Sequence, residues 1–342
     1  HILGALCLAL LPQMKSPSAM FALMLVNMMF YMPTISLSIT VSYSAMNKAG
    51  MDVVKEYPPI RVWGTVGFIV AMWTVSLLKI ETSALQFYVA AIAAVILGSY
   101  AFTLPKCDVS KQVEKKTLVD TLGLRAFTLF KQPKMALFFL FSMLLGAALQ
   151  LTNAYGDTFL HDFAKVDAYK DLVAIKYPAI IMSISQMSET LFILTIPFFL
   201  RKFGIKNVML FSMIAWVLRF ALFGLGNPAE GLWMIILSCI VYGMAFDFFN
   251  ISGSLYVETQ TDHSIRASAQ GVFMMMTNGF GAVLGSISSG FIIDSFFKAE
   301  NGDFQWQGIW FTFAAYALIV AILFAVSFKH KHDPSQLADI KH

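Results

Sequence analysis

Long apolar stretches separated by short charged segments run through the whole chain. A helix that crosses the roughly 30 Å hydrocarbon core of a bilayer needs about 20 apolar residues. Nine stretches reach or approach this length with at most one Asp, Glu, Lys, Arg or His inside: 16–47, 62–78, 82–105, 135–156, 177–200, 207–229, 231–257, 267–293 and 304–328. Residues 1–13 have the composition of the end of a tenth. Continuous runs of this kind predict an all-α polytopic membrane protein, because barrel strands alternate apolar and polar positions.

The composition agrees with a chain that lies in lipid. Of the 342 residues, 58% are hydrophobic and 13% are charged, whereas soluble domains carry about 25% charged residues. So few charges cannot cover a water-exposed surface of this size. The composition therefore excludes a soluble enzyme, a nucleic-acid-binding protein and a disordered protein.

Cysteine and histidine give no sign of a metal site or of a reactive centre. The three cysteines have neither disulfide nor metal-ligand spacing, and the six histidines lie at chain ends or in loops. A Gly-rich phosphate loop is also missing, so ATP is not expected as a direct energy source. We expect no metal and no cofactor. A polytopic membrane enzyme remains an alternative, although it would need a nucleophile and a base near the membrane surface.

The placement of the positive charges predicts how the chain crosses the membrane. Successive loops lie on alternate sides of the membrane and so form two sets. Of the 24 Lys and Arg residues, 17 fall in one set and 6 in the other, and Arg219 lies inside a span. Because cytoplasmic loops carry the excess of Lys and Arg, the richer set and the C-terminus are expected to face the cytoplasm.

The longest loop divides the chain into two groups of spans. We expect an incomplete N-terminal helical bundle at 1–105, a cytoplasmic central loop at 106–134, a C-terminal six-helix bundle at 135–329 and a cytoplasmic tail at 330–342. The chain begins inside an apolar run and without Met. We interpret it as truncated at the N-terminus, the remainder of a six-plus-six transporter that lacks two helices.

One span carries a carboxylate on a polar stripe. Ser183, Gln186 and Glu189 follow one another at three-residue intervals and so share a helix face. Ionisable groups inside spans are costly and usually face a cavity. This stripe is interpreted as a water-lined or substrate-lined wall, with a polar clamp between helices as the alternative.

Two further spans carry polar pairs. Gln150 and Asn153 lie at i, i+3, and two amides on one face can donate and accept hydrogen bonds together, which suits a neutral ligand. An interhelical hydrogen bond explains them equally well. Arg61, Thr65 and Phe68 fall near one face of another span, where Arg61 can also reach the cytoplasmic interface.

A fourth span combines aromatic and charged residues. Tyr242 and Phe246 are four apart and form an aromatic ledge that can stack on a flat ring, although such stripes often only pack. Asp247 follows directly, and either pairs with Arg219 or carries a proton. The Gly- and Ser-rich stretch 271–291 is assigned to helix packing and conformational change.

Several long blocks resemble one known family. They are FYMPTISLSITVSY, NKAGMDVVKEYPPIRVWGTVGFIVAMW, FFLFSMLLGAALQLTNAYGDTFLH, IIMSISQMSETLFILTIPFFLRKFGIKNVM, AWVLRFALF, IVYGMAFDFFNISGS and IRASAQGVFMMMTNGFG. With them the chain resembles the nucleoside:H⁺ symporter family of the major facilitator superfamily over nearly its whole length. The resemblance implies a twelve-helix fold, of which about ten helices are present and His1 falls in the third.

The resemblance also implies a function and a site. It implies a proton-coupled nucleoside transporter of the bacterial inner membrane that works by alternating access as a monomer, with H⁺ as coupling ion. Glu189 and Asp247 are its candidate proton carriers. The substrate-binding residues that it implies are Arg61, Thr65, Phe68, Gln150, Asn153, Gln186, Glu189, Tyr242, Phe246 and Asp247.

Two alternatives stay within the same fold. RVWGTVGF also resembles the fifth-helix signature of lactose-permease-like symporters, which leaves a proton-coupled sugar symporter possible. Paired amides favour a nucleobase over a sugar. A non-transporting truncated remnant is the other alternative, since two helices of the expected twelve are missing.

Overall fold

The computed structural model describes residues 1–51, 53–105, 124–262, 265–300 and 302–330. The described part is built of helices, as the apolar runs predict, with one isolated β-bridge between Lys298 and Phe304. It divides into two compact units, His1–Val113 and Glu114–Lys341, and each is described by itself. The central loop predicted at 106–134 lies outside the described residues as far as 123, and so does the tail from 331 onward.

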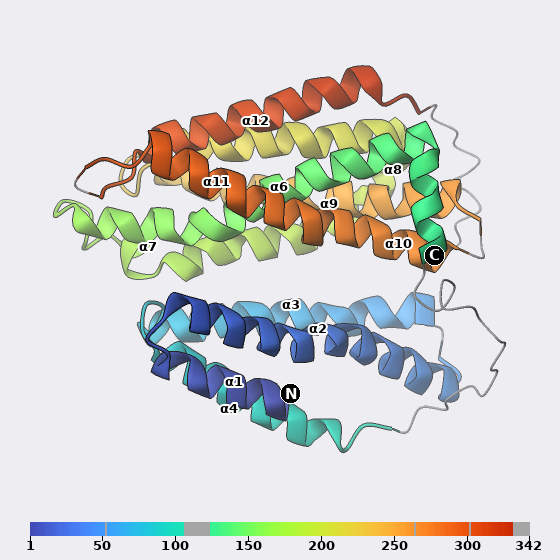
Figure 1. Ribbon diagram of the computed structural model, residues 1–342, viewed down its shortest axis with the longest axis horizontal. Coiled ribbons are helices and arrows are strands. Elements are labelled where there is room, and N and C mark those ends of the chain that lie inside the picture. Colours follow the sequence, from blue (N-terminus) through green and yellow to red (C-terminus); the bar gives the residue numbers. More distant parts are fainter. Residues whose placement is uncertain (52, 106–123, 263–264, 301, 331–342) are drawn as a thin grey trace. The chain divides into compact units, whose positions relative to one another are not determined.

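In its described residues the first unit contains four apolar helices (Figure 1). They are α1 (Ile2–Leu10), continued by a 3₁₀ turn at Leu11–Gln13, α2 (Pro17–Lys48), α3 (Val53–Leu77) and α4 (Leu85–Ala101). Helix α1 packs against α2 and α4, and the side chain of Ile2 lies against Gly98. Most large apolar side chains of α2, α3 and α4 stay exposed in this unit, as expected of helices that face lipid.

The second unit contains the longer helices and the larger core. Its elements are a 3₁₀ helix η2 (Leu124–Lys131), α6 (Pro133–Asp162), a 3₁₀ turn η3 (Phe163–Lys165), α7 (Val173–Lys176), α8 (Pro178–Leu225), α9 (Leu232–Gln260), α10 (Arg266–Met274), a π-helical segment η4 (Met275–Gly281), α11 (Ala282–Phe296) and α12 (Trp306–Ser327). Aromatic side chains fill its seams. The ring of Phe159, for example, lies 5.4–5.6 Å from those of Phe223, Trp306 and Trp310.

Helix α8 covers two of the predicted spans. Its backbone leaves the helical conformation at Gly204, where φ is 76° and ψ is 166°. Only glycine adopts this conformation without strain. The bend lies between the charges of Arg201, Lys202 and Lys206, where the sequence predicts the loop between spans 177–200 and 207–229. Each predicted span thus corresponds to helix within the described residues.

Small residues bring α6 close to the helix formed by α10, η4 and α11. A Cβ atom on Gly146 would lie 2.0 Å from the carbonyl oxygen of Thr277, and one on Gly285 would lie 2.8 Å from that of Ala147. Gly281 meets the carbonyl oxygen of Met143 in the same way. These contacts confirm that the Gly- and Ser-rich stretch packs against a neighbouring helix.

Candidate functional site

The helices α8 and α9 cross in close contact at Gly243. A Cβ atom at this position would lie 2.6 Å from the carbonyl carbon of Ser188 and 2.7 Å from the backbone nitrogen of Glu189. The hydroxyl of Ser188 donates a hydrogen bond to the carbonyl oxygen of Ile240 across the same crossing. The predicted polar stripe of α8 is therefore held against the turn of α9 that carries Tyr242.

The aromatic ledge predicted on α9 is present. The rings of Tyr242 and Phe246 stack with their centroids 5.7 Å apart and their planes at 6°. Trp216 of α8 meets the ring of Tyr242 edge-on at 5.9 Å. Tyr242 is buried and Phe246 is half-buried, so Phe246 is the more accessible of the two stacked rings.

The polar residues of the stripe differ in their exposure. Gln186 and Glu189 are half-buried, whereas Ser183 is fully buried and donates a hydrogen bond to the carbonyl oxygen of Ile180. The two partly open side chains are thus the ones that carry an amide and a carboxylate. They are the members of the stripe that a ligand can reach.

Helix α6 brings the amide pair to the same level as this stripe. A Cβ atom on Gly156 would lie only 2.9 Å from the terminal methyl group of Met182, so α6 and α8 touch there. α6 and α8 are successive membrane spans of the chain, so they run in opposite directions. Asn153, three residues before Gly156, therefore lies about level with Gln186, four residues after Met182. Gln150 lies about one turn before Asn153 on α6. It is half-buried, whereas Asn153 is exposed.

The charged residues of this region gather around Tyr242. The guanidinium carbon of Arg219 lies 4.5 Å from the ring centre of Tyr242, and the backbone of Glu189 lies against Gly243, the residue after Tyr242. Asp247 is 4% exposed and Arg219 is 0% exposed. Arg219 is a possible partner of Asp247 by charge, but its guanidinium group donates hydrogen bonds to the hydroxyl of Thr152 and to the carbonyl oxygen of Ser238.

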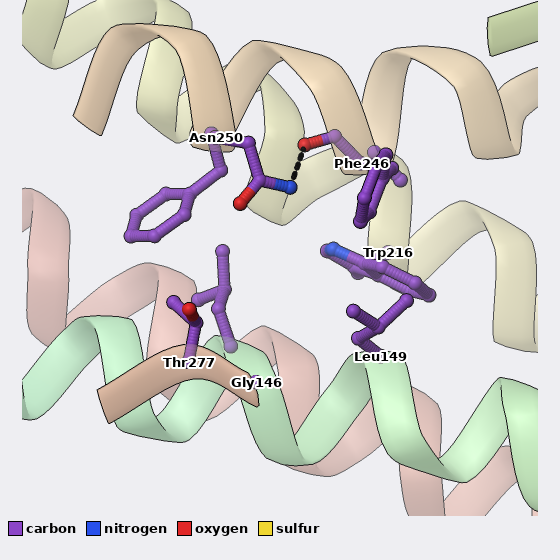
Figure 2. A pocket seen from close by; sticks show the side chains of 9 residues that line it. Gly146, Leu149, Trp216, Phe246, Asn250 and Thr277 are labelled. Carbon is purple, nitrogen blue, oxygen red and sulfur yellow. Dashed lines mark hydrogen bonds between the residues drawn. The ribbon is translucent and has the colours of Figure 1, made fainter. Parts of the chain in front are cut away.

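A small pocket lies beside the aromatic ledge. Figure 2 shows Phe246 and Asn250 of α9 on one side of it and Gly146 and Leu149 of α6 on the other, with Trp216 also at its wall. Its volume is about 20 Å³, enough for one water molecule. The amide of Asn250 donates a 2.9 Å hydrogen bond to the carbonyl oxygen of Phe246, drawn as a dashed line.

Trp216 is a residue that sequence reasoning did not single out. It contacts the ring of Tyr242 and lines the pocket, yet it lies in an apolar span where a tryptophan gives no signal of its own. The one available signal is its spacing of three residues from Arg219, the single charge of that span.

The three predicted residues of the first unit lie on α3. Thr65 is half-buried and Phe68 is 53% exposed. The side chain of Arg61 is outside the described residues. That these three residues join those of α6, α8 and α9 in one site stays a prediction.

Comparisons with known proteins place the chain in a family. The family described as nucleoside H⁺ symporter matches residues 1–333. The chain belongs to this family. It is 55% identical to the xanthosine permease of Escherichia coli K12, over 98% of this chain and 80% of the relative. It is 52% identical to the nucleoside permease NupG of the same organism, over 97% of this chain and 79% of the relative.

Solved structures give the same answer for the fold. Two crystal structures of the nucleoside transporter NupG, one of them of a mutant, match with TM-scores of 0.91 and 0.88 at 52% identity, and each covers 96% of this chain and 81% of theirs. This symporter therefore has the major facilitator fold that the resemblance implies. It is a multi-pass membrane transport protein and not an enzyme, as predicted.

Proposed function

We propose that this symporter carries nucleosides across the bacterial inner membrane together with protons, by alternating access. The support comes from the family and from relatives named for nucleoside and xanthosine transport. The observation that carries the proposal is the crossing at Gly243, because it holds an accessible carboxylate, Glu189, beside a stacked aromatic ledge. A nucleoside needs both, since it combines a flat base with a hydroxyl-rich ribose.

The base stacks on the accessible ring of Phe246, which Tyr242 supports from behind. Stacking of a base on an aromatic side chain contributes about 1–3 kcal/mol. The amides of α6 and α8 bind the polar edge of the base and the sugar hydroxyls, and each such group left unpaired in a dry site costs about 1–3 kcal/mol. The amides proposed for this role are Gln150, Asn153 and Gln186.

Three residues of the first unit are also proposed to bind the substrate. Phe68 is proposed to flank the base, Thr65 to offer a hydroxyl, and Arg61 to supply a counter-charge to the carboxylates.

Two acidic residues are proposed as proton carriers, and they differ in their surroundings. A carboxyl group in a site of low polarity can load and release a proton near neutral pH. Glu189 is half-buried and can bind ribose hydroxyls as well, whereas Asp247 is 4% exposed. Either acid can therefore couple substrate binding to the proton, and the two can be separated by substitution.

The test is nucleoside uptake into proteoliposomes with and without an imposed pH gradient. We expect wild-type protein to accumulate nucleosides when the lumen is alkaline. Glu189→Gln and Asp247→Asn are compared in accumulation and in counterflow exchange, which needs no net proton movement. The variant that loses accumulation but keeps exchange identifies the coupling acid. Accumulation by both variants at the wild-type level would remove both acids from coupling.

A sugar symporter with the same fold is tested in the same vesicles. Adenosine or xanthosine should compete with labelled uridine, and lactose should not. Competition by lactose alone would overturn the nucleoside assignment.

We further propose that the protein is a monomer and that its C-terminus faces the cytoplasm. Mass measurement in detergent would test the first, and protease treatment of inverted vesicles would test the second.

A further inference from the structure

One positive charge lies fully buried in the second unit, and the proposed transport mechanism does not use it. Arg219, in the second half of α8, is 0% exposed within an otherwise apolar span. Burial of a guanidinium group is costly unless hydrogen bonds and aromatic or charged neighbours compensate for it. A methionine of similar length would fill the same space without that cost, so packing alone does not account for this residue.

The guanidinium group is held on its edge and on its flat faces. Its Nε donates a hydrogen bond of 3.3 Å to the hydroxyl of Thr152, and a terminal nitrogen donates one of 2.8 Å to the carbonyl oxygen of Ser238. The hydroxyl of Ser238 donates a hydrogen bond back to the carbonyl oxygen of Arg219, at 2.9 Å. The guanidinium carbon lies 4.5 Å from the ring centre of Tyr242 and 4.9 Å from that of Phe223.

These partners connect Arg219 with the helices of the proposed site. Thr152 is on α6, in the turn between Gln150 and Asn153. Ser238 is on α9, one turn before Tyr242. The cation–π contact then fixes the ring of Tyr242 itself, because a planar cation is attracted to the face of an aromatic ring. Lysine would keep the charge but lacks the planar fork that makes both kinds of contact.

We propose that Arg219 is a positioning residue for ligand recognition, which holds the ring of Tyr242 in its stack with Phe246 and fastens α9 to the amide-bearing turn of α6. The proposal rests on the proposed function for the ligand. Its structural part, the immobilisation of Tyr242, does not depend on which ligand is carried.

The experiment compares the purified intact transporter with Arg219→Met, Arg219→Lys and a matched control, Ser212→Ala. Ser212 is also fully buried on α8, and its hydroxyl donates a hydrogen bond to the carbonyl oxygen of Ala245 on α9, away from the guanidinium group. The control therefore removes one contact from the same pair of helices without touching Arg219. Thermal unfolding in detergent first establishes that each variant is folded.

Two readouts follow. Calorimetric binding of adenosine, uridine and xanthosine should weaken at least tenfold in Arg219→Met, less in Arg219→Lys, and under twofold in Ser212→Ala. Fluorine NMR of protein labelled with 3-fluorotyrosine, with the Tyr242 signal assigned by its loss in Tyr242→Phe, should show that signal shifted or broadened in Arg219→Met and unchanged in Ser212→Ala.

The outcomes separate this proposal from the proposed function. Wild-type nucleoside affinity together with an unchanged Tyr242 signal in folded Arg219→Met would overturn the positioning role. If wild-type protein binds none of the nucleosides but its Tyr242 signal depends on Arg219, the transport assignment fails and the positioning of Tyr242 stands. Where Arg219→Met is not recovered from membranes, Arg219→Lys decides, and wild-type values for it would overturn the need for the planar group.

Discussion

Gly243 of α9 lies directly against the backbone of Glu189 on α8, with no room between them for a side chain. The contact is one of backbone against backbone, which only small residues allow between membrane helices. It sets the distance between the candidate carboxylate and the aromatic ledge. The position of Glu189 therefore depends on a residue that itself offers no chemistry to a ligand.

Gly243→Ala should push α8 and α9 apart. The added methyl group would meet backbone atoms at 2.6–2.7 Å, and forced insertion into a packed core costs about 1–3 kcal/mol. We expect a lower midpoint of thermal unfolding in detergent and weaker nucleoside binding. Gly290→Ala is the control, because a Cβ atom there meets nothing within 4 Å. Equal stability and affinity for the two variants would contradict the importance of this crossing.

Phe246→Leu should weaken nucleoside binding more than it weakens the fold. Leucine keeps an apolar side chain but cannot stack on a base, which contributes about 1–3 kcal/mol, or roughly a 5- to 150-fold change in Kd. Phe248→Leu is the matched substitution in the core, where Phe248 packs on Phe199 with centroids 4.9 Å apart. It should lower thermal stability and leave Kd unchanged. The reverse pattern would place the base elsewhere.

The sequence predicts the helices well because the bilayer leaves the backbone few alternatives. An apolar run about as long as the membrane is thick must satisfy its own backbone hydrogen bonds, so the spans at 135–156 and 231–257 could be assigned by length alone. The stripe at Gln186 and Glu189 could be assigned because polar residues are conspicuous in such runs.

The crossings between helices could not be predicted in the same way. Nothing in the local sequence of Gly243 pairs it with Glu189, because 54 positions of chain separate them and the contact depends on the packing of two helices. The partners of Arg219 show the same limit. Asp247 is the evident candidate by charge. The guanidinium group of Arg219 instead donates its hydrogen bonds to a threonine hydroxyl and to a main-chain carbonyl oxygen.

Gly204→Ala should strain the bend within α8. The conformation there, with φ of 76° and ψ of 166°, is essentially restricted to glycine, and other residues pay about 1–3 kcal/mol to adopt it. Asparagine, which tolerates the left-handed helical region, should give no rescue because this is a different region. Gly64→Ala, inside α3 where a Cβ atom meets nothing, should be neutral or stabilising. Thermal unfolding of the three variants measures the difference.

Trp306→Phe should loosen the junction between the end of α6 and the start of α12. The indole nitrogen of Trp306 donates a 2.8 Å hydrogen bond to the carboxylate of Asp162, and hydrogen bonds to charged groups contribute about 1.5–3 kcal/mol. Trp310→Phe removes the same volume, but its indole nitrogen has no hydrogen-bond partner in the described part of the chain. A thermal midpoint that falls equally in both variants would show that volume, and not the hydrogen bond, matters.

The π-helical segment Met275–Gly281 gives the transporter a surplus residue in the middle of a membrane helix. A π turn takes up one residue more than an α turn over the same hydrogen-bonded loop. A single-residue deletion within this segment can therefore be absorbed by rewinding it as α-helix, which keeps Gly285 in register with α6. The same deletion in the middle of α9 would rotate everything beyond it by about 100°. Evolution or an engineer can thus shorten the chain here at a position where most membrane helices would lose their alignment.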